Sequence, residues 1–188
     1  MTHIRDEGKD NDHREERELY RIFYYDCPPL KKTVYHPALK RGIDFGKSDT
    51  YRWANAFFEE LKKKRKVALR MGRLSDAGAH FALSADATKA LCRKERNVDD
   101  LKESDFTISF NQKGVDMRIG LDIASLAYKK QVDQIILLAG DSDFVPAAKL
   151  ARREGIDFIL DPMEATIPKD LFEHIDGLKS CWKKREHK

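Results

Sequence analysis

The sequence predicts an α/β fold built on a parallel sheet, and one stretch carries most of this prediction. Residues 135–138 form a short apolar run rich in β-branched side chains, which is typical of a strand buried on both faces. A helical pattern then runs from Pro146 to about Glu154, Gly155 ends it, and residues 156–160 form a second apolar run. This order indicates two parallel strands joined by a helix.

The N-terminal part of the chain contributes one further strand. Residues 1–18 are polar and dense in charges of both signs, so we expect a disordered tail there. Residues 19–26 are rich in aromatic side chains and predict a strand, which Pro28 and Pro29 end because proline cannot donate to a ladder. Residues 30–47 show no clear periodicity, and we interpret them as a loop.

The middle of the chain alternates helical and strand patterns. Ser48 or Asp49 can cap a helix in which Phe57 and Leu61 are the expected core anchors. We then expect strands at residues 67–71 and 105–110, a helix at 85–95 and a loop at 97–104, while residues 72–83 are ambiguous. No repeat or low-complexity linker interrupts this order, so a single domain is expected over residues 19–178.

An amphipathic helix is predicted to begin near residue 112. Its apolar stripe contains Ile119, Ile123, Leu126 and Ala127, which fall at i, i+4, i+7 and i+8. Residues 168–178 predict a last helix, and a basic tail over residues 179–188 follows it.

The composition excludes several classes of protein. The chain of 188 residues has three cysteines without a CxxC pair and no apolar N-terminal signal, so we expect free thiols and a cytoplasmic location. No apolar run is long enough to cross a bilayer, so no membrane partner is expected. The six histidines form neither HExxH nor finger spacing, which gives no basis for a zinc site.

The formal net charge of +4 permits a nucleic-acid partner without requiring one. Phosphate contacts are expected from the basic run Lys62, Lys63, Lys64 and Arg65, and residues 183–185 begin a second basic run. The alternative for both runs is a solvated helix end or tail.

Carboxylates follow the predicted strands, at the positions where open α/β sheets bind ligands. Asp141 and Asp143 come shortly after the strand at residues 135–138, and Asp26 ends the first strand. Two carboxylates at i and i+2 repel each other unless a cation such as Mg²⁺ or Mn²⁺ neutralises them. The alternative is that they form only a turn and a helix cap, which are two roles that aspartate favours.

Two more acidic residues lie on the helix that begins near residue 112. Asp116 is at the helix start, where the helix dipole favours negative charge, and is the better candidate for a metal ligand. Asp122 lies about 240° further round an ideal helix, so both side chains cannot point at one site. We therefore interpret Asp122 as a solvated carboxylate or as a support for a metal ligand.

The order of these motifs resembles the NYN domain of the LabA-like proteins, which belong to the PIN-like nuclease superfamily. The motifs that carry the resemblance are Lys113-Gly114-Val115-Asp116, Gly140-Asp141-Ser142-Asp143 and Pro146. The resemblance is strongest over residues 112–163 and weaker over residues 19–71. It implies a Rossmann-like parallel sheet flanked by helices and a role in the processing or cleavage of RNA.

The resemblance also implies a site for Mg²⁺ or Mn²⁺. Its ligands would be Asp116, Asp141 and Asp143, and the family pattern gives some support to Asp122 as well. Lys113 would contact the RNA backbone, and the alternative for this residue is a solvated loop lysine.

One departure from the family concerns its first strand, which usually ends in an Asp followed shortly by Asn. This chain has no such strand before Leu19, and the strand at residues 19–26 resembles the second strand of the family. Either the first strand is missing, which we favour, or Asp26 takes the place of its carboxylate. An incomplete sheet edge would also permit a homodimer.

Three functions follow as hypotheses. The first is a metal-dependent endoribonuclease, in which the metal activates water at the acidic site. The second is a module that binds RNA or protein without turnover, because the first-strand carboxylate is absent. The third, ranked last, is a phosphatase of the haloacid-dehalogenase type, since Gly140-Asp141-Ser142-Asp143 resembles the metal loop of those enzymes but Asp26-Cys27 does not supply their nucleophile motif.

Overall fold

Two small parallel sheets form the centre of the protein in the computed structural model, which describes residues 17–180, except for the side chains of residues 76 and 77. The first sheet pairs β1 (Ile22–Asp26) with β4 (Val67–Met71). The second contains β7 (Gln134–Leu138), β8 (Asp157–Asp161) and β9 (Gly177–Leu178) in that order. In the part of the chain that is described, no ladder joins β1 to β7, so the single parallel sheet that we expected is divided into two.

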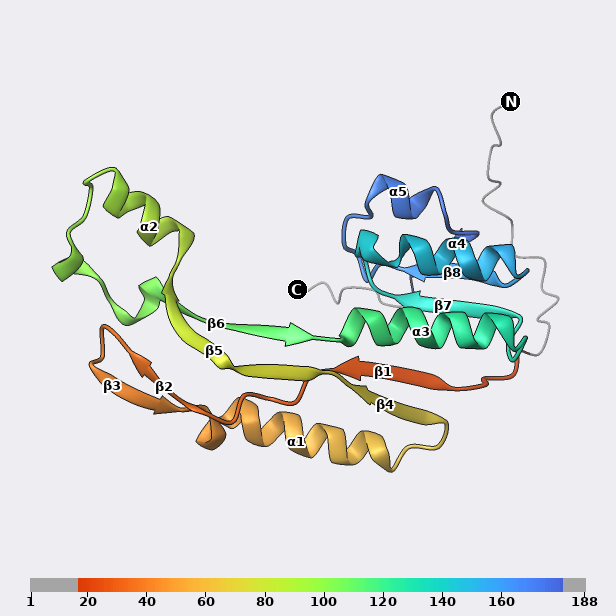
Figure 1. Ribbon diagram of the computed structural model, residues 1–188, viewed down its shortest axis with the longest axis horizontal. Coiled ribbons are helices and arrows are strands. Elements are labelled where there is room, and N and C mark those ends of the chain that lie inside the picture. Colours follow the sequence, from red (N-terminus) through yellow and green to blue (C-terminus); the bar gives the residue numbers. More distant parts are fainter. Residues whose placement is uncertain (1–16, 181–188) are drawn as a thin grey trace, which may run out of the picture.

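The strands of both sheets run in the same direction, as the arrowheads of β1, β4, β7 and β8 show (Figure 1). All four strands therefore end on the same side of the molecule, which we call the carboxyl edge. The amino edge is the opposite side, where these strands begin.

Helices pack on both faces of the first sheet and in the core with the second sheet. The longer ones are α1 (Asp49–Lys62), α3 (Val115–Tyr128) and α4 (Val145–Arg153), and α5 (Lys169–Phe172) is a single turn. Tyr24 of β1 contacts Phe57 of α1, whereas the next residue, Tyr25, bonds to α3, so α1 and α3 lie on opposite faces of the first sheet. Among the described helices, none is long and apolar enough to cross a membrane.

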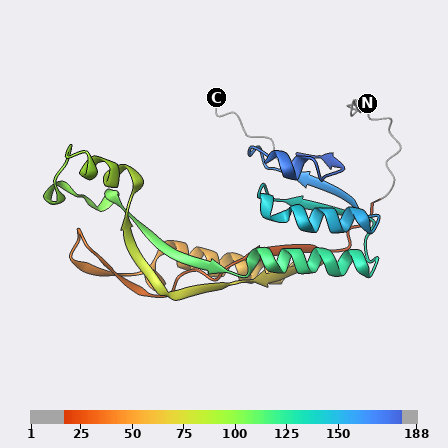
Figure 2. The ribbon, with the colours of Figure 1, turned by 45° about the horizontal axis from the view of Figure 1, so that its top comes forward.

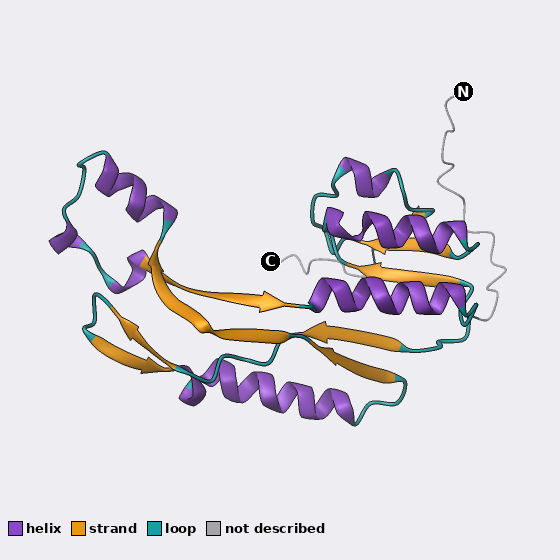
Figure 3. Ribbon diagram, in the orientation of Figure 1, coloured by secondary structure: helices purple, strands orange, loops and turns teal. Residues whose placement is uncertain are grey.

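An arm rich in strands projects from the carboxyl edge (Figures 2 and 3). Its spine is the antiparallel ribbon of β5 (Arg73–Leu83) and β6 (Phe106–Lys113), which carries α2 (Ala85–Cys92) at its far end. A hairpin of β2 (Thr33–His36) and β3 (Arg41–Asp44) lies beside this ribbon. The part of the chain that the structure describes also contains four short 3₁₀ turns: η1 (Phe45–Lys47), η2 (Val98–Asp100), η3 (Glu103–Asp105) and η4 (Ser142–Phe144).

The main core lies between α3, α4 and the second sheet. Ile119, Ile123 and Ala127 of α3 pack there, as their spacing predicts, against Leu137 and Phe158 of the two strands. A second, smaller cluster fixes the hairpin to the arm. The buried ring of His36 lies 4.3 Å from the ring of Phe81 and 5.2 Å from that of Phe106, measured between centroids.

Several elements differ from the sequence-based expectations. Residues 30–47 contain the hairpin of β2 and β3 rather than only a loop, because its strands are stabilised by pairing with each other. The last helix stops at Phe172, since the chain returns to pair β9 with β8. The expectation of a disordered tail at residues 1–18 falls almost wholly outside the described residues, as does the basic run at residues 183–185.

Candidate active site at the carboxyl edge

Four of the five candidate acidic residues lie along the carboxyl edge. Asp26 is the last residue of β1, and Asp141 and Asp143 follow the end of β7. Asp116 lies in the first turn of α3, directly after the arm returns to the sheets. The side chains of Asp116, Asp141 and Asp143 are exposed, whereas Asp26 is half-buried.

Asp26 and Asp116 both lie close enough to the Cys27 thiol to influence its pKa. Burial raises the pKa of this thiol, and the negative charges of Asp26 and Asp116 raise it further, while a hydrogen bond with the Lys113 backbone lowers it. Asp26 Oδ1 also accepts a hydrogen bond from the Cys27 N–H at 2.7 Å. These three side chains therefore form one half of the acidic edge.

Gly72 makes this close approach possible. It follows β4, and its N–H donates to the Asp26 carbonyl oxygen at 2.7 Å. A Cβ at this position would lie 2.7 Å from Val115 Cγ2 and 2.9 Å from the Lys113 carbonyl oxygen. The absence of a side chain thus lets the end of β4 contact the start of α3.

Asp141 and Asp143 form the other half of the acidic edge, on the second sheet. Asp141 is the N-cap of η4, and its Oδ1 accepts a hydrogen bond from the Asp143 N–H at 3.1 Å. The capping role that aspartate favours is therefore present at Asp141. It leaves both carboxylates exposed to solvent.

Asp122 lies away from this edge, in the middle of α3. Its Oδ2 accepts hydrogen bonds from the Tyr25 hydroxyl and from Arg70 Nε, each at 2.9 Å. The carboxylate joins α3 to β1 and β4, so its observed contacts are those of a structural residue. This agrees with the helix geometry, which separates Asp122 from Asp116.

The carboxylates have the right chemistry for a hard cation, but no three of them come together in the described part of the chain. Mg²⁺ and Mn²⁺ prefer oxygen ligands, which these side chains supply. Across residues 17–180, no group of three or more His, Cys, Asp or Glu side chains is placed to hold a metal ion. Asp26 ends a strand of the first sheet, Asp141 and Asp143 follow a strand of the second, and Asp116 lies on α3, which packs against both sheets.

The basic run that the sequence singled out lies on the opposite side of the molecule. Lys62 ends α1, and the residues that follow lead into the start of β4 at the amino edge. Lys62 pairs with Glu59 at 2.6 Å and Lys63 with Glu60 at 2.7 Å. Lys113, by contrast, ends β6 beside the acidic edge, and its side chain is exposed.

Sequence reasoning missed two features of the carboxyl edge. Asp161 ends β8 and is almost completely buried, with Oδ1 accepting from the Met163 N–H at 2.9 Å. The sequence could have indicated this residue, because Asp161 directly follows the apolar run at residues 156–160. The second feature is a concentration of positive charge in the segment that follows Asp26, which we call the basic hairpin segment (residues 27–47).

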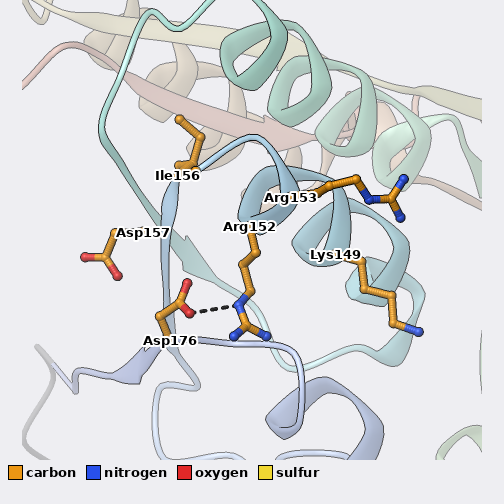
Figure 4. A pocket seen from close by; sticks show the side chains of 7 residues that line it. Lys149, Arg152, Arg153, Ile156, Asp157 and Asp176 are labelled. Carbon is orange, nitrogen blue, oxygen red and sulfur yellow. Dashed lines mark hydrogen bonds and ion pairs between the residues drawn. The ribbon is translucent and has the colours of Figure 1, made fainter.

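A shallow hollow lies away from the acidic edge, at the C-terminal end of α4 (Figure 4). Lys149, Arg152 and Arg153 line it, and Arg152 Nε donates to Asp176 at 2.8 Å. The hollow borders the start of β8, so it belongs to the amino edge and shares no residue with the acidic edge.

The alternating α/β order, with acidic residues along one edge, agrees with a family comparison. The model of the NYN domain family matches residues 43–176. The chain belongs to the NYN domain family. The match includes Asp116, Asp141 and Asp143 and leaves out β1 with Asp26.

The NYN domain is a nuclease-type domain of the PIN-like group, and the family suggests RNA as the substrate. The narrower LabA-like assignment stays a prediction. A comparison with curated proteins and another with solved structures gave no match.

Proposed function

We propose that this NYN domain is a ribonuclease that hydrolyses phosphodiester bonds at its carboxyl edge and depends on Mg²⁺ or Mn²⁺. The observation that carries the proposal is that Asp26, Asp116, Asp141 and Asp143 all lie along the carboxyl edge. The chain also belongs to a family of nuclease-type domains. Carboxylates at such an edge can accept a proton from an attacking water.

The basic hairpin segment is the surface that we expect to hold the RNA backbone. It contains five of the 36 Lys and Arg residues and one of the 32 Asp and Glu residues, so the rest of the chain is electrically balanced. Lys31, Lys40 and Arg41 are exposed, and the buried His36 fixes their hairpin to the arm. Because the segment begins directly after Asp26, cations for phosphate contacts lie on the acidic side of the molecule.

The experiment that tests this function is the cleavage of labelled single-stranded and structured RNA with Mn²⁺, with Mg²⁺ or with EDTA. We expect metal-dependent cleavage that the Asp116→Asn and Asp141→Asn variants lose by more than about tenfold, because each variant removes a carboxylate. Asp133→Asn is the matched control, since Asp133 is an exposed carboxylate just before β7, at the amino edge. Cleavage that survives EDTA, or that these two variants retain, would contradict the proposal.

A second candidate is an RNA-binding module without turnover. The observation that favours it is that the described carboxylates do not converge in a group of three. This candidate predicts RNA binding by the folded protein and no cleavage with either cation. The same assay therefore separates the two functions.

A further inference from the structure

A pair of stacked aromatic rings lies on the surface of α1. The Trp53 ring stacks on that of Phe57, with centroids 5.2 Å apart and planes that differ by only 5°. Trp53 is nevertheless 66% exposed, so the indole contacts Phe57 on one face while much of the ring is open to solvent. The contact with Phe57 therefore orients an exposed aromatic surface before any ligand binds.

A series of contacts connects this indole to the acidic edge. The Phe57 ring lies 5.5 Å from that of Tyr24 in β1, and the Tyr24 hydroxyl donates to Asp26 Oδ2 at 3.3 Å. Tyr24 and Asp26 point to the same face of β1, because side chains alternate along a strand, and α1 packs on that face. Trp53 is therefore joined to the Asp26 carboxylate through two aromatic rings.

Cations lie near the same end of α1. The helix begins on the side of the arm and ends at the amino edge, so Trp53 lies toward the basic hairpin segment (Figure 1). Arg52 and Lys47 are both exposed, and Arg52 Nη1 donates to the Lys47 carbonyl oxygen at 3.0 Å. This bond joins the last residue of the basic hairpin segment to the start of α1. Proteins bind single-stranded nucleic acid by combining such cations with an exposed aromatic ring.

We propose that Trp53 stacks on an unpaired base of the RNA, while the basic hairpin segment contacts the phosphates beside that nucleotide. The π face of a base is available for such stacking only where the base is splayed out, because neighbouring base pairs cover it inside a duplex. The excess of Lys and Arg in the adjoining segment favours an anionic ligand over an apolar peptide. The ligand of the indole is therefore a single-stranded nucleotide.

This inference deepens the proposed function and rests on it for the choice of RNA as the ligand. It makes Trp53 a residue that determines specificity, since the RNA must be unpaired beside the acidic edge. Stacking of the base, however, needs neither a metal ion nor cleavage. The test therefore measures binding in EDTA, where a loss of nuclease activity cannot affect the result.

The probe is a single-stranded RNA of about ten nucleotides, which is within the usual site size for such surfaces. It is compared with the same strand in a duplex and with a strand whose nucleotides are abasic. A Trp182→Phe background leaves Trp53 as the only tryptophan, so the quenching of indole fluorescence reports stacking. At saturation, we expect quenching by the single strand and little quenching by the duplex or by the abasic strand.

Trp53→Ala measures what the ring contributes to binding. We expect this variant to bind the single strand about fivefold or more weakly and to bind the abasic strand as the wild type does, because only the first has bases to stack. Trp53→Phe keeps an aromatic ring and should retain most of the affinity. Tyr128→Ala is the matched control, since Tyr128 is 64% exposed at the end of α3, at the amino edge, and its removal should leave binding unchanged.

The outcomes separate this inference from the proposed function. Equal losses of affinity for the natural and abasic strands in Trp53→Ala would show that the ring only supports the fold, and would overturn the inference. Bound RNA without quenching, or no RNA binding at all, would overturn it as well. Stacking without metal-dependent cleavage would support it and contradict only the ribonuclease. Metal-dependent cleavage with unchanged RNA affinity in Trp53→Ala would support the ribonuclease and overturn the inference.

Discussion

The Tyr25 hydroxyl donates a hydrogen bond to Asp122 Oδ2 at 2.9 Å, and so fixes β1 to α3, the helix that also packs against the second sheet. The same oxygen accepts from Arg70 Nε of β4, also at 2.9 Å. The Asp122 carboxylate therefore attaches α3 to both strands of the first sheet.

This contact predicts a structural role for Asp122. Asp122→Asn should lower the free energy of unfolding by about 1–2 kcal/mol, because charged hydrogen bonds at a partly buried site become neutral ones. RNA cleavage, if present, should persist at a temperature where the variant is folded. Urea denaturation and the cleavage assay together check this. Loss of cleavage with unchanged stability would instead assign Asp122 to the active site.

Tyr25 predicts a loss of stability at alkaline pH. Burial raises the pKa of its phenol, and the hydrogen bond to Asp122 raises it further. Unfolded tyrosine ionises near pH 10, so the unfolded state releases this proton before the folded state does. The stabilising contribution is therefore complete below about pH 10 and is lost as the pH rises above it.

The comparison that checks this is between the wild type and Tyr25→Phe. Urea denaturation from about pH 8 to about pH 11 should show a steeper fall in stability for the wild type. Parallel curves for the two proteins would show that another group controls the alkaline transition.

Gly72 predicts a steric penalty at the acidic edge. Its Cβ in Gly72→Ala would lie 2.7 Å from Val115 Cγ2 and 2.9 Å from the Lys113 carbonyl oxygen, which is backbone and cannot rotate away. We expect a loss of about 1–3 kcal/mol in unfolding free energy, as for overpacked cores. Gly120→Ala is the control, because nothing lies within 4 Å of its Cβ and it is in α3. The control should be neutral or stabilising, and equal losses in both variants would refute the packing argument.

The two described cysteines should differ in reactivity. Cys27 is 5% exposed and its thiol pKa is raised chiefly by burial, so little thiolate forms near pH 7. Cys92 is exposed at the end of α2. In a Cys181→Ser background, we expect a thiol reagent to modify Cys92 rapidly and Cys27 only after urea is added. Equal rates under native conditions would mean that the acidic edge opens readily.

The basic hairpin segment predicts the electrostatic surface for RNA. Replacing Lys31, Lys40 and Arg41 by Glu should weaken RNA binding by about tenfold or more in EDTA. It should also reduce the slope of log affinity against log salt by about 2, because three phosphate contacts are lost.

The control for this prediction is the replacement of Lys62, Lys63 and Arg65 by Glu at the amino edge. These residues belong to the basic run from which the sequence predicted phosphate contacts, and two of them, Lys62 and Lys63, already pair with glutamates. A larger loss of binding in the control would move the RNA to the amino edge.

The sequence by itself determined the elements whose signals are local. The pattern offered Ser48 or Asp49 as the cap of α1, and Ser48 takes this role, since its Oγ accepts from the Tyr51 N–H at 3.1 Å. The spacing of Ile119 and Ile123 identified the buried face of α3. Such features depend on residues within one or two turns of each other, so a linear pattern records them.

Only the tertiary structure decided which edges and side chains meet. Ile136 belongs to an apolar run that predicted a strand buried on both faces, yet it is 42% exposed because no strand or helix of the described chain covers that side. Asp122 accepts hydrogen bonds from Tyr25 and Arg70, which lie in strands far from it in sequence. Strand pairing and burial depend on which distant segments are present to supply partners, and no local pattern contains that information.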